Sequence, residues 1–256
     1  MSTTPNPIPG SIISDGGARG MILIVGAPFT GKSTAAATFP NAVFLDFDHK
    51  APQNTTTIPF WSADFCDKLA ARKNPNHTPN QKDALINYLK RHVITPDPSQ
   101  RIPLDTTLIL DSMTKLEEGI HLQIQQEGIP IGKGGQPDGF HLWKIKIDYL
   151  NSLFAMMQAW PGTFICIMHE TPEYNESGGQ TGRIKPLLSG SYADKIGSKF
   201  TCMFRQRVIA ATTSPPSPAQ YVWDVQPTRA FDSNNVLGLK SPVIRATYQD
   251  MMNAKS

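Results

Sequence analysis

The nine residues GAPFTGKST, numbered 26–34, decide how the rest of this chain is interpreted. They follow the apolar run MILIV (residues 21–25) and precede AAATF (residues 35–39). They fill every fixed position of the pattern GxxxxGK[ST], and their neighbours predict a strand before the loop and a helix after it. A loop with this pattern in this setting is typical of a phosphate-binding site.

The chemistry of phosphate binding explains the residue types in this loop. Glycines let successive backbone N–H groups curl around a phosphate, and a helix N-terminus adds partial positive charge. Lys32 is predicted to reach the terminal phosphates of a nucleotide, and Ser33 to bind Mg²⁺. The predicted nucleotide-binding residues are Gly26, Ala27, Pro28, Phe29, Thr30, Gly31, Lys32, Ser33 and Thr34.

The overall composition is that of a globular protein. The chain has 256 residues, 39% of them hydrophobic and 18% charged, which excludes a disordered chain and allows one large domain. A net charge of +3 is too small to indicate a nucleic-acid-binding protein and does not exclude one. No apolar run reaches the roughly 18 residues of a membrane span. Residues 1–19 lack the pattern of a signal peptide and are predicted to form a flexible arm.

The cysteines give no sign of a disulfide framework or a zinc site. Cys66, Cys166 and Cys202 are far apart and have no histidine partner at ligand spacing. This usage fits a reducing compartment, and we expect a cytoplasmic protein.

Short apolar runs alternate with helical patterns along the chain. The alternation predicts a mostly parallel sheet with helices on both faces, and two antiparallel strands near the C-terminus. The predicted strands are 21–25, 42–46, 107–111, 163–168, 201–210 and 221–226. The predicted helices follow the phosphate loop and cover 63–72, 80–93, 112–126 and 141–160, while 51–60, 128–139 and 171–182 are predicted loops. We expect a core at 20–230 and a C-terminal extension at 231–256.

A second metal partner is predicted at the end of the run TLILD. Asp111 ends this predicted strand, and a carboxylate there holds a water on Mg²⁺ in many phosphate-loop proteins. Many ATPases carry a glutamate directly after this aspartate, but here the next residue is Ser112. The carboxylate that activates water must therefore come from another strand end.

The second predicted strand offers that carboxylate. It ends in Asp46-Phe47-Asp48-His49, and strand alternation aims Asp46 and Asp48 to the same side. Asp48 lies just past the strand end, where it is placed to accept a hydrogen bond from the attacking water. Asp48 is therefore the predicted general base.

The fourth predicted strand ends in Met168-His169-Glu170. If this strand lies between the first and the third, His169 points toward the terminal phosphate. An imidazole there can sense the phosphate whether it is neutral or protonated. His169 is therefore predicted to take part in catalysis beside Lys32.

Taken in order, the segments GAPFTGKS, VFLDFDH, TLILDS and TFICIMHE resemble the core of RecA-type ATPases. In that group the catalytic carboxylate follows the second strand in a D-x-E-H setting, which resembles Asp46-Phe47-Asp48-His49 with Asp for Glu. The polar sensor of the fourth strand, commonly glutamine, resembles His169. The stretch RIKPLLSGSYADKIGSKFTCMFRQRV is similar to the phage-encoded minimal RecA-like ATPases of single-strand annealing and recombination. The resemblance covers roughly residues 20–230.

The resemblance implies ATP hydrolysis with Mg²⁺ and binding of single-stranded DNA. The family places its DNA-binding loops after the third and fourth strands, which here implies Lys133, Arg183 and Lys185 as DNA contacts. Phe140 and Tyr174 are the aromatic candidates for base stacking. A phage-encoded member would act in the host cytoplasm.

The same resemblance implies a homo-oligomer, a filament or a ring, with ATP between subunits. A neighbouring subunit would then supply a cation, for which the candidates are Arg205, Arg207, Arg229 and Lys240. Two alternatives stay open at this point. A small-molecule or nucleotide kinase shares the phosphate loop but should carry an arginine-rich lid, and no such arginine cluster is present. A non-catalytic nucleotide switch needs no water-activating carboxylate, so Asp48 distinguishes it from an ATPase.

Overall fold

In this computed structural model, the structure describes residues 20–60, 81–93, 95, 97, 99, 101–127, 139–189, 192–214 and 216–255. The predicted arm at 1–19 and the predicted helix at 63–72 lie outside these ranges, as does Lys133. Within the described ranges, no helix combines the length and the apolar character needed to cross a bilayer.

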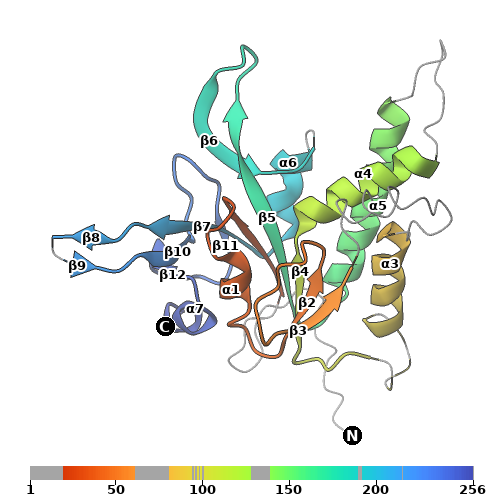
Figure 1. Cartoon of the computed structure of the whole chain (residues 1–256), viewed down its shortest axis with the longest axis horizontal. Coiled ribbons are helices and arrows are strands. Elements are labelled where there is room, and N and C mark those ends of the chain that lie inside the picture. Colours follow the sequence, from red (N-terminus) through yellow and green to blue (C-terminus); the bar gives the residue numbers. More distant parts are fainter. Residues whose placement is uncertain are drawn as a thin grey trace, which may run out of the picture.

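A ten-stranded sheet forms the centre of the molecule (Figure 1). Along its main path the strands follow the order β12-β10-β7-β1-β5-β4-β2-β3, with β11 pairing with β7 and β6 with β5. Its strands are β1 (Gly20–Gly26), β2 (Ala42–Asp46), β3 (Thr56–Pro59), β4 (Thr107–Asp111), β5 (Thr163–Tyr174), β6 (Gln180–Pro186), β7 (Cys202–Ile209), β10 (Gln220–Asp224), β11 (Asn234–Asn235) and β12 (Val243–Arg245). A separate short pair joins β8 (Thr212–Thr213) to β9 (Pro216–Ser217).

The strand directions confirm the predicted fold class. β1 pairs in parallel with both β5 and β7, and the parallel series continues through β4 and β2 to β3. β10 and β12 extend the sheet in antiparallel fashion beyond β7. The fourth predicted strand, β5, lies between β1 and β4 as the argument about His169 required. This is an α/β core with a mostly parallel sheet and antiparallel strands in its C-terminal part.

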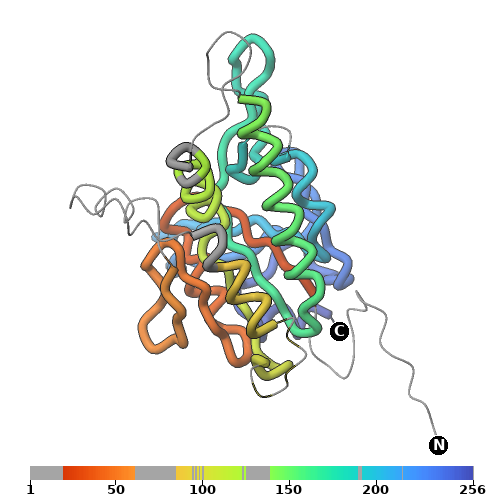
Figure 2. The backbone as a smooth tube through the Cα atoms, turned by 90° about the vertical axis from the view of Figure 1, so that its right-hand side faces the viewer, coloured from red at the N-terminus to blue at the C-terminus, as the bar shows by residue number. Residues whose placement is uncertain are grey.

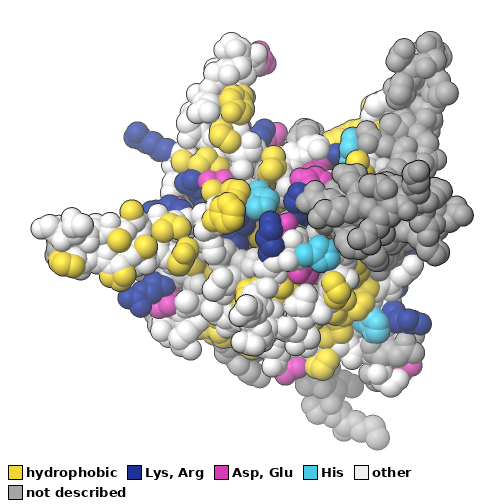
Figure 3. Space-filling model, in the orientation of Figure 1, with side chains coloured by type: hydrophobic (Ala, Val, Ile, Leu, Met, Phe, Trp, Pro, Cys, Tyr) yellow, Lys and Arg dark blue, Asp and Glu magenta, His cyan; other side chains and the backbone are white. Residues whose placement is uncertain are grey.

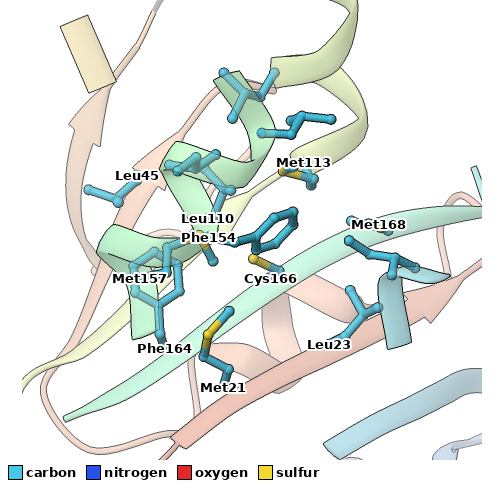
Figure 4. Close-up of a cluster of buried hydrophobic side chains, with 14 of the residues drawn as sticks. Met21, Leu23, Leu45, Leu110, Met113, Phe154, Met157, Phe164, Cys166 and Met168 are labelled. Atoms are coloured by element: carbon cyan, nitrogen blue, oxygen red, sulfur yellow. The ribbon is translucent and has the colours of Figure 1, made fainter. Parts of the chain in front are cut away.

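Helices cover both faces of the sheet. The described helices are α1 (Lys32–Ala36), α3 (Gln81–His92), α4 (Met113–Glu127), α5 (Gly139–Gln158), α6 (Tyr192–Lys195) and α7 (Tyr248–Asn253), with a 3₁₀ turn η2 at Ile196–Lys199. The larger core packs α3, α4 and α5 against one face, and Figure 4 shows Phe154 and Met157 of α5 beside Cys166 and Phe164 of β5. The smaller core packs α1 and α7 against the other face. Because both faces of the sheet are buried, the sequences of the central strands are continuous apolar runs.

Two predicted loops contain strands instead. In the predicted loop 51–60, Thr56–Pro59 forms β3, which pairs in parallel with β2 at the edge of the sheet. The predicted loop 171–182 was also wrong, because β5 continues to Tyr174 and turns back as β6. This hairpin projects from the body in Figure 2, and its mainly exposed, polar residues carry no hydrophobic alternation.

The last part of the chain belongs to the same sheet. β11 pairs with β7 and β12 with β10, and Phe231 and Met251 are fully buried. Residues 231–255 thus add β11 and β12 to the sheet, with Phe231 in the larger core and Met251 in the smaller one.

Candidate nucleotide site

The predicted phosphate loop connects β1 to α1 at the carboxyl end of the sheet. Gly31 has a φ of 77°, a left-handed conformation that favours glycine. At Gly26 an added Cβ would lie 2.5 Å from the carbonyl oxygen of Gln206, so a side chain there would collide with β7. Both fixed glycines of the pattern are thus required by local geometry. Phe29 is almost fully exposed at the tip of the loop.

Lys32 lies buried at the start of α1, and its side chain reaches back to the first residues of the loop. Its Nζ donates hydrogen bonds to the carbonyl oxygens of Gly26 at 2.9 Å and Ala27 at 2.7 Å. Burial lowers the pKa of Lys32, while the nearby carboxylates of Asp111, Glu170 and Asp48 oppose that shift. The Lys32 ammonium group is near three carboxylates, and its hydrogen-bond acceptors in the described part of the chain are these two carbonyl oxygens. It is therefore positioned to exchange them for phosphate oxygens.

Three residues of the C-terminal strands support the loop, and the sequence did not reveal them. Buried Gln206 donates from Nε2 to the carbonyl oxygen of Thr30 at 2.6 Å, and accepts at Oε1 from Trp223 Nε1 at 2.9 Å. The ring of Tyr221 lies 3.1 Å from the position of a Cβ added to Gly31. The one available signal was Gln206 itself, a polar residue two positions after Phe204 on the same buried strand face.

Asp111 ends β4 directly beside Asp46 of β2. The Ser33 side chain hydrogen bonds to Asp111, while Asp111 Oδ2 is buried without a hydrogen-bond partner in the described part of the chain. Burial raises the pKa of Asp111 to about 6, the hydrogen bond from Ser33 opposes the rise, and the charges of Asp46 and Asp48 add to it.

These donors fit a magnesium ion that arrives with a nucleotide. Among the described residues no three His, Cys, Asp or Glu side chains form a metal cluster. Mg²⁺ prefers oxygen ligands and is commonly held by one or two protein groups plus phosphates and waters. The Ser33 hydroxyl and the unpartnered Asp111 Oδ2 match that requirement.

The raised pKa of Asp111 leads to a prediction about stability. Since the folded-state pKa of about 6 exceeds the ordinary value of 3.8, this group stabilises the fold fully below about pH 4, and that contribution disappears as pH rises to 6. Asp111→Asn should therefore raise the free energy of unfolding of the nucleotide-free protein at pH 7.5 by on the order of 2–3 kcal/mol, and by much less at pH 4.5. Urea titrations at both pH values measure this difference.

Asp105→Asn is the matched control, because Asp105 is exposed and lies at the other end of β4. It should show no comparable gain at pH 7.5. An equal gain for Asp111→Asn at both pH values would contradict the assignment of a buried, proton-binding carboxylate.

Asp46 and Asp48 have different environments despite their spacing. The Asp46 carboxylate accepts hydrogen bonds from the backbone N–H groups of Asp48, His49 and Ala51, at 3.0, 2.7 and 3.3 Å. It therefore fixes the turn after β2. The Asp48 side chain is 15% exposed, and its Oδ1 lies 3.5 Å from Lys50 Nζ. Asp48 is the carboxylate of this pair that retains capacity to accept a hydrogen bond from water.

His169 lies beside the first residue of the phosphate loop, because its Cα pairs with that of Gly26 in the β5–β1 ladder. Its backbone N–H donates to Thr114 Oγ1 at 3.1 Å. Its Nδ1 is buried and has no partner among the described residues. Burial lowers the pKa of His169, and the positive charge of Lys32 lowers it further. The imidazole is thus neutral at pH 7, with a ring nitrogen available for a ligand.

Glu170 is also close to Lys32, but its carboxylate is occupied. Arg205 donates from Nε to Oε2 at 2.9 Å and from Nη2 to Oε1 at 3.2 Å. Since β1 lies between β5 and β7, this bidentate pair spans the start of the phosphate loop. Arg207, two residues on, is similarly paired with Asp224.

The structure therefore gathers most of the predicted site at one edge of the sheet. Figure 3 shows cationic, acidic and histidine side chains together near the centre of the face in view. Lys32, Asp48 and His169 are mutually within electrostatic reach, as are Lys32 and Asp111. Arg183 and Lys185 lie on β6 instead, away from the phosphate loop.

A comparison with protein families matches residues 18–237 to the model described as an AAA domain. The chain belongs to this AAA domain family. The match spans β1 to β11, so it includes the phosphate loop, Asp48, Asp111 and His169. The AAA domain assignment and the P-loop fold identify an ATPase-type, nucleotide-binding protein.

No curated protein matches this AAA domain chain. Solved structures similar to it include the flagellar accessory protein FlaH from Methanocaldococcus jannaschii, at 13% identity and a TM-score of 0.36, covering 88% of this chain and 84% of that one. The RadB recombinase is 10% identical in sequence, with a TM-score of 0.40. The match covers 82% of this chain and 90% of the RadB chain. An ATPase from the type III secretion system of pathogenic bacteria is 12% identical in sequence, with a TM-score of 0.36. The match covers 73% of this chain and 52% of the chain of that ATPase.

Proposed function

We propose that this protein is a Mg²⁺-dependent ATPase whose hydrolysis is coupled to binding single-stranded DNA. The observation that carries the ATPase proposal is the pair of buried, unpartnered atoms Asp111 Oδ2 and His169 Nδ1 beside the phosphate loop. Buried polar atoms are normally hydrogen-bonded, so two unpartnered atoms at one site favour a bound ligand. A nucleotide triphosphate with Mg²⁺ supplies partners for both.

Each residue then has a defined task. Lys32 and the loop amides hold the β- and γ-phosphates, while Ser33 and Asp111 would hold a Mg²⁺ ion, which would supply positive charge beside these phosphates. Asp48 accepts a hydrogen bond from the attacking water, orients it and takes its proton. Neutral His169 contacts the γ-phosphate and changes partner when that phosphate leaves. Asp48 is favoured over Glu170 as the base because Arg205 occupies both oxygens of Glu170.

We further propose that a second copy of the chain completes the site, in a filament or a ring. Two of the four candidate cations are engaged within the subunit, since Arg205 binds Glu170 and Arg207 binds Asp224. Arg229 is exposed, and the described residues show no ion pair for it. Arg229 is therefore the candidate we favour for contacting ATP bound to a neighbouring subunit. The cysteine usage favours a cytoplasmic location, in the host if a phage encodes the protein.

The DNA proposal depends on the β5–β6 hairpin. The first strand of this hairpin, β5, also carries His169. The base of the hairpin is closed at that residue, where the His169 carbonyl oxygen accepts a hydrogen bond from the N–H of Leu187, just after β6. A change at the γ-phosphate can thus reach the hairpin through one strand. Arg183 and Lys185 lie two residues apart on β6, so they share one face and are suited to neighbouring phosphates. Tyr174, half exposed at the end of β5, supplies an aromatic ring.

The test is the ATPase rate with and without single-stranded DNA, for the parent and for Arg183→Gln/Lys185→Gln. The parent should be stimulated by DNA. The double variant should bind DNA more weakly for all sequences, and its dependence of log affinity on log salt should be shallower by about one to two units. Basal ATP turnover without DNA should be unchanged. An unchanged salt dependence would place the DNA contacts elsewhere on the protein.

A further inference from the structure

The two cations of β6 line a cavity that the sequence did not predict. Its volume is about 560 Å³, and it lies between β6, α6, η2 and the segment 231–234. Ile184, Met203 and Phe231 contribute apolar surface to its walls. Arg183 and Lys185 are at its rim, together with three carboxylates.

Both cations are held by carboxylates of the same chain. The Arg183 guanidinium contacts the carboxylate of Asp232 and lies 3.7 Å from that of Glu173. Lys185 Nζ lies 3.6 Å from Asp194 Oδ1. These carboxylates come from three different elements, namely β5, α6 and the segment that follows β10. The rim thus carries two positive and three negative charges, which would repel a polyanion.

The ion pairs are exposed, and exposed pairs are exchangeable. The side chain of Asp232 is 73% exposed and that of Asp194 is 58% exposed. Surface ion pairs contribute little to stability and are screened by salt. A phosphate offers an arginine the same bidentate geometry as a carboxylate. The hairpin itself is anchored independently, because the backbone N–H of Ile184 donates to the carbonyl oxygen of Ala230 at 2.7 Å.

We propose that Asp232 and Asp194 mask the anion-binding face of the β5–β6 hairpin, and that the backbone of single-stranded DNA binds there by displacing them. This inference rests on the proposed DNA-binding function and adds its regulation. The carboxylates pair with Arg183 and Lys185 and so lower the affinity of both cations for weak anions. Only a ligand that offers several phosphates at once competes with both carboxylates.

The test compares Asp232→Asn and Asp194→Asn with Glu176→Gln in the full-length protein. Glu176 lies in the turn of the same hairpin, and the described residues show no ion pair for it. Binding of a labelled oligothymidylate is measured by fluorescence anisotropy at several salt concentrations. Each aspartate variant should bind about three- to tenfold more tightly at low salt, with a steeper salt dependence, whereas Glu176→Gln should change affinity less than twofold. In an Arg183→Gln background, Asp232→Asn should bring no further gain.

The possible outcomes separate this inference from the proposed function. If the parent binds DNA through Arg183 and Lys185, but the aspartate variants bind no more tightly than Glu176→Gln, masking is wrong and the DNA proposal stands. If only the aspartate variants bind DNA, masking is supported, and the two carboxylates prevent DNA binding by the parent. If the parent and all variants fail to bind, both proposals fail. Thermal unfolding of each variant should match the parent, because the replaced carboxylates are exposed.

Discussion

Replacing Asp48 with asparagine should lower ATP turnover by about 10²–10⁴-fold while nucleotide binding persists. This decrease equals the rate enhancement that general acid–base catalysis usually contributes, because asparagine keeps the shape of the side chain but cannot take a proton from water. Binding should persist because Lys32, Ser33 and Asp111 are unchanged. Affinity for single-stranded DNA in the presence of ATP should be unchanged or higher, since the variant no longer hydrolyses its bound ATP and remains in the ATP-bound state. Steady-state hydrolysis, measured beside calorimetric titration with ATP, checks both expectations.

Glu170→Gln is the informative comparison for this variant. Both oxygens of Glu170 bind Arg205, so the variant should lose part of an ion pair but keep turnover within about tenfold of the parent. Asp46→Asn should also affect turnover less than Asp48→Asn does. It should mainly destabilise the turn after β2, where Asp46 accepts three backbone hydrogen bonds. Near-normal turnover in Asp48→Asn together with a large loss in Glu170→Gln would transfer the role of base to Glu170.

The central strands could be predicted from sequence because burial on both faces leaves a plain signal. Ala42–Asp46 and Thr107–Asp111 have the predicted bounds, and β1 extends the predicted strand by one residue at each end. Each of these strands is an apolar run that ends at a polar residue or a glycine. In a parallel sheet such ends meet at one edge, so the candidate site residues could be predicted together with the strands.

The elements that sequence reasoning missed depend on partners far along the chain. β3 is only four residues long and is a strand because β2 lies beside it, 13 residues earlier in register. The β5–β6 hairpin is polar on both sides, so hydrophobic alternation cannot reveal it. Propensity and pattern are local signals, whereas strand pairing at an exposed edge is decided by contacts that a local window does not contain.

The same limit applies to the site. The motif residues were predicted because their chemistry fixes their spacing, as it does for Gly26, Gly31 and Lys32. Gln206 was missed because its contact with Thr30 joins residues 176 positions apart. The pairing of Arg183 with Asp232 was likewise invisible, since no sequence rule connects a cation on β6 to an acid 49 residues later.

Lys32→Ala should weaken nucleotide binding by roughly 10- to 150-fold and abolish measurable hydrolysis. The estimate corresponds to losing hydrogen bonds to a charged group, worth about 1.5–3 kcal/mol. In the structure Lys32 Nζ donates hydrogen bonds to the carbonyl oxygens of Gly26 and Ala27, so its side chain lies along the loop that would hold the phosphates. Binding ATP therefore requires only an exchange of partners and no large movement of the side chain.

The experiment uses calorimetry with ATP for Lys32→Ala and for Lys50→Ala. Lys50 is a matched control, because it is a cation at the rim of the same site whose side chain is 70% exposed. Its loss should change ATP affinity less than about threefold, since exposed charges are screened. Thermal unfolding without nucleotide should show that Lys32→Ala remains folded, since the change removes two hydrogen bonds at the end of β1 and leaves the pairing of β1 with β5 and β7 intact. If Lys32→Ala binds ATP as tightly as the parent, the loop at 26–34 is a structural turn and not the nucleotide site.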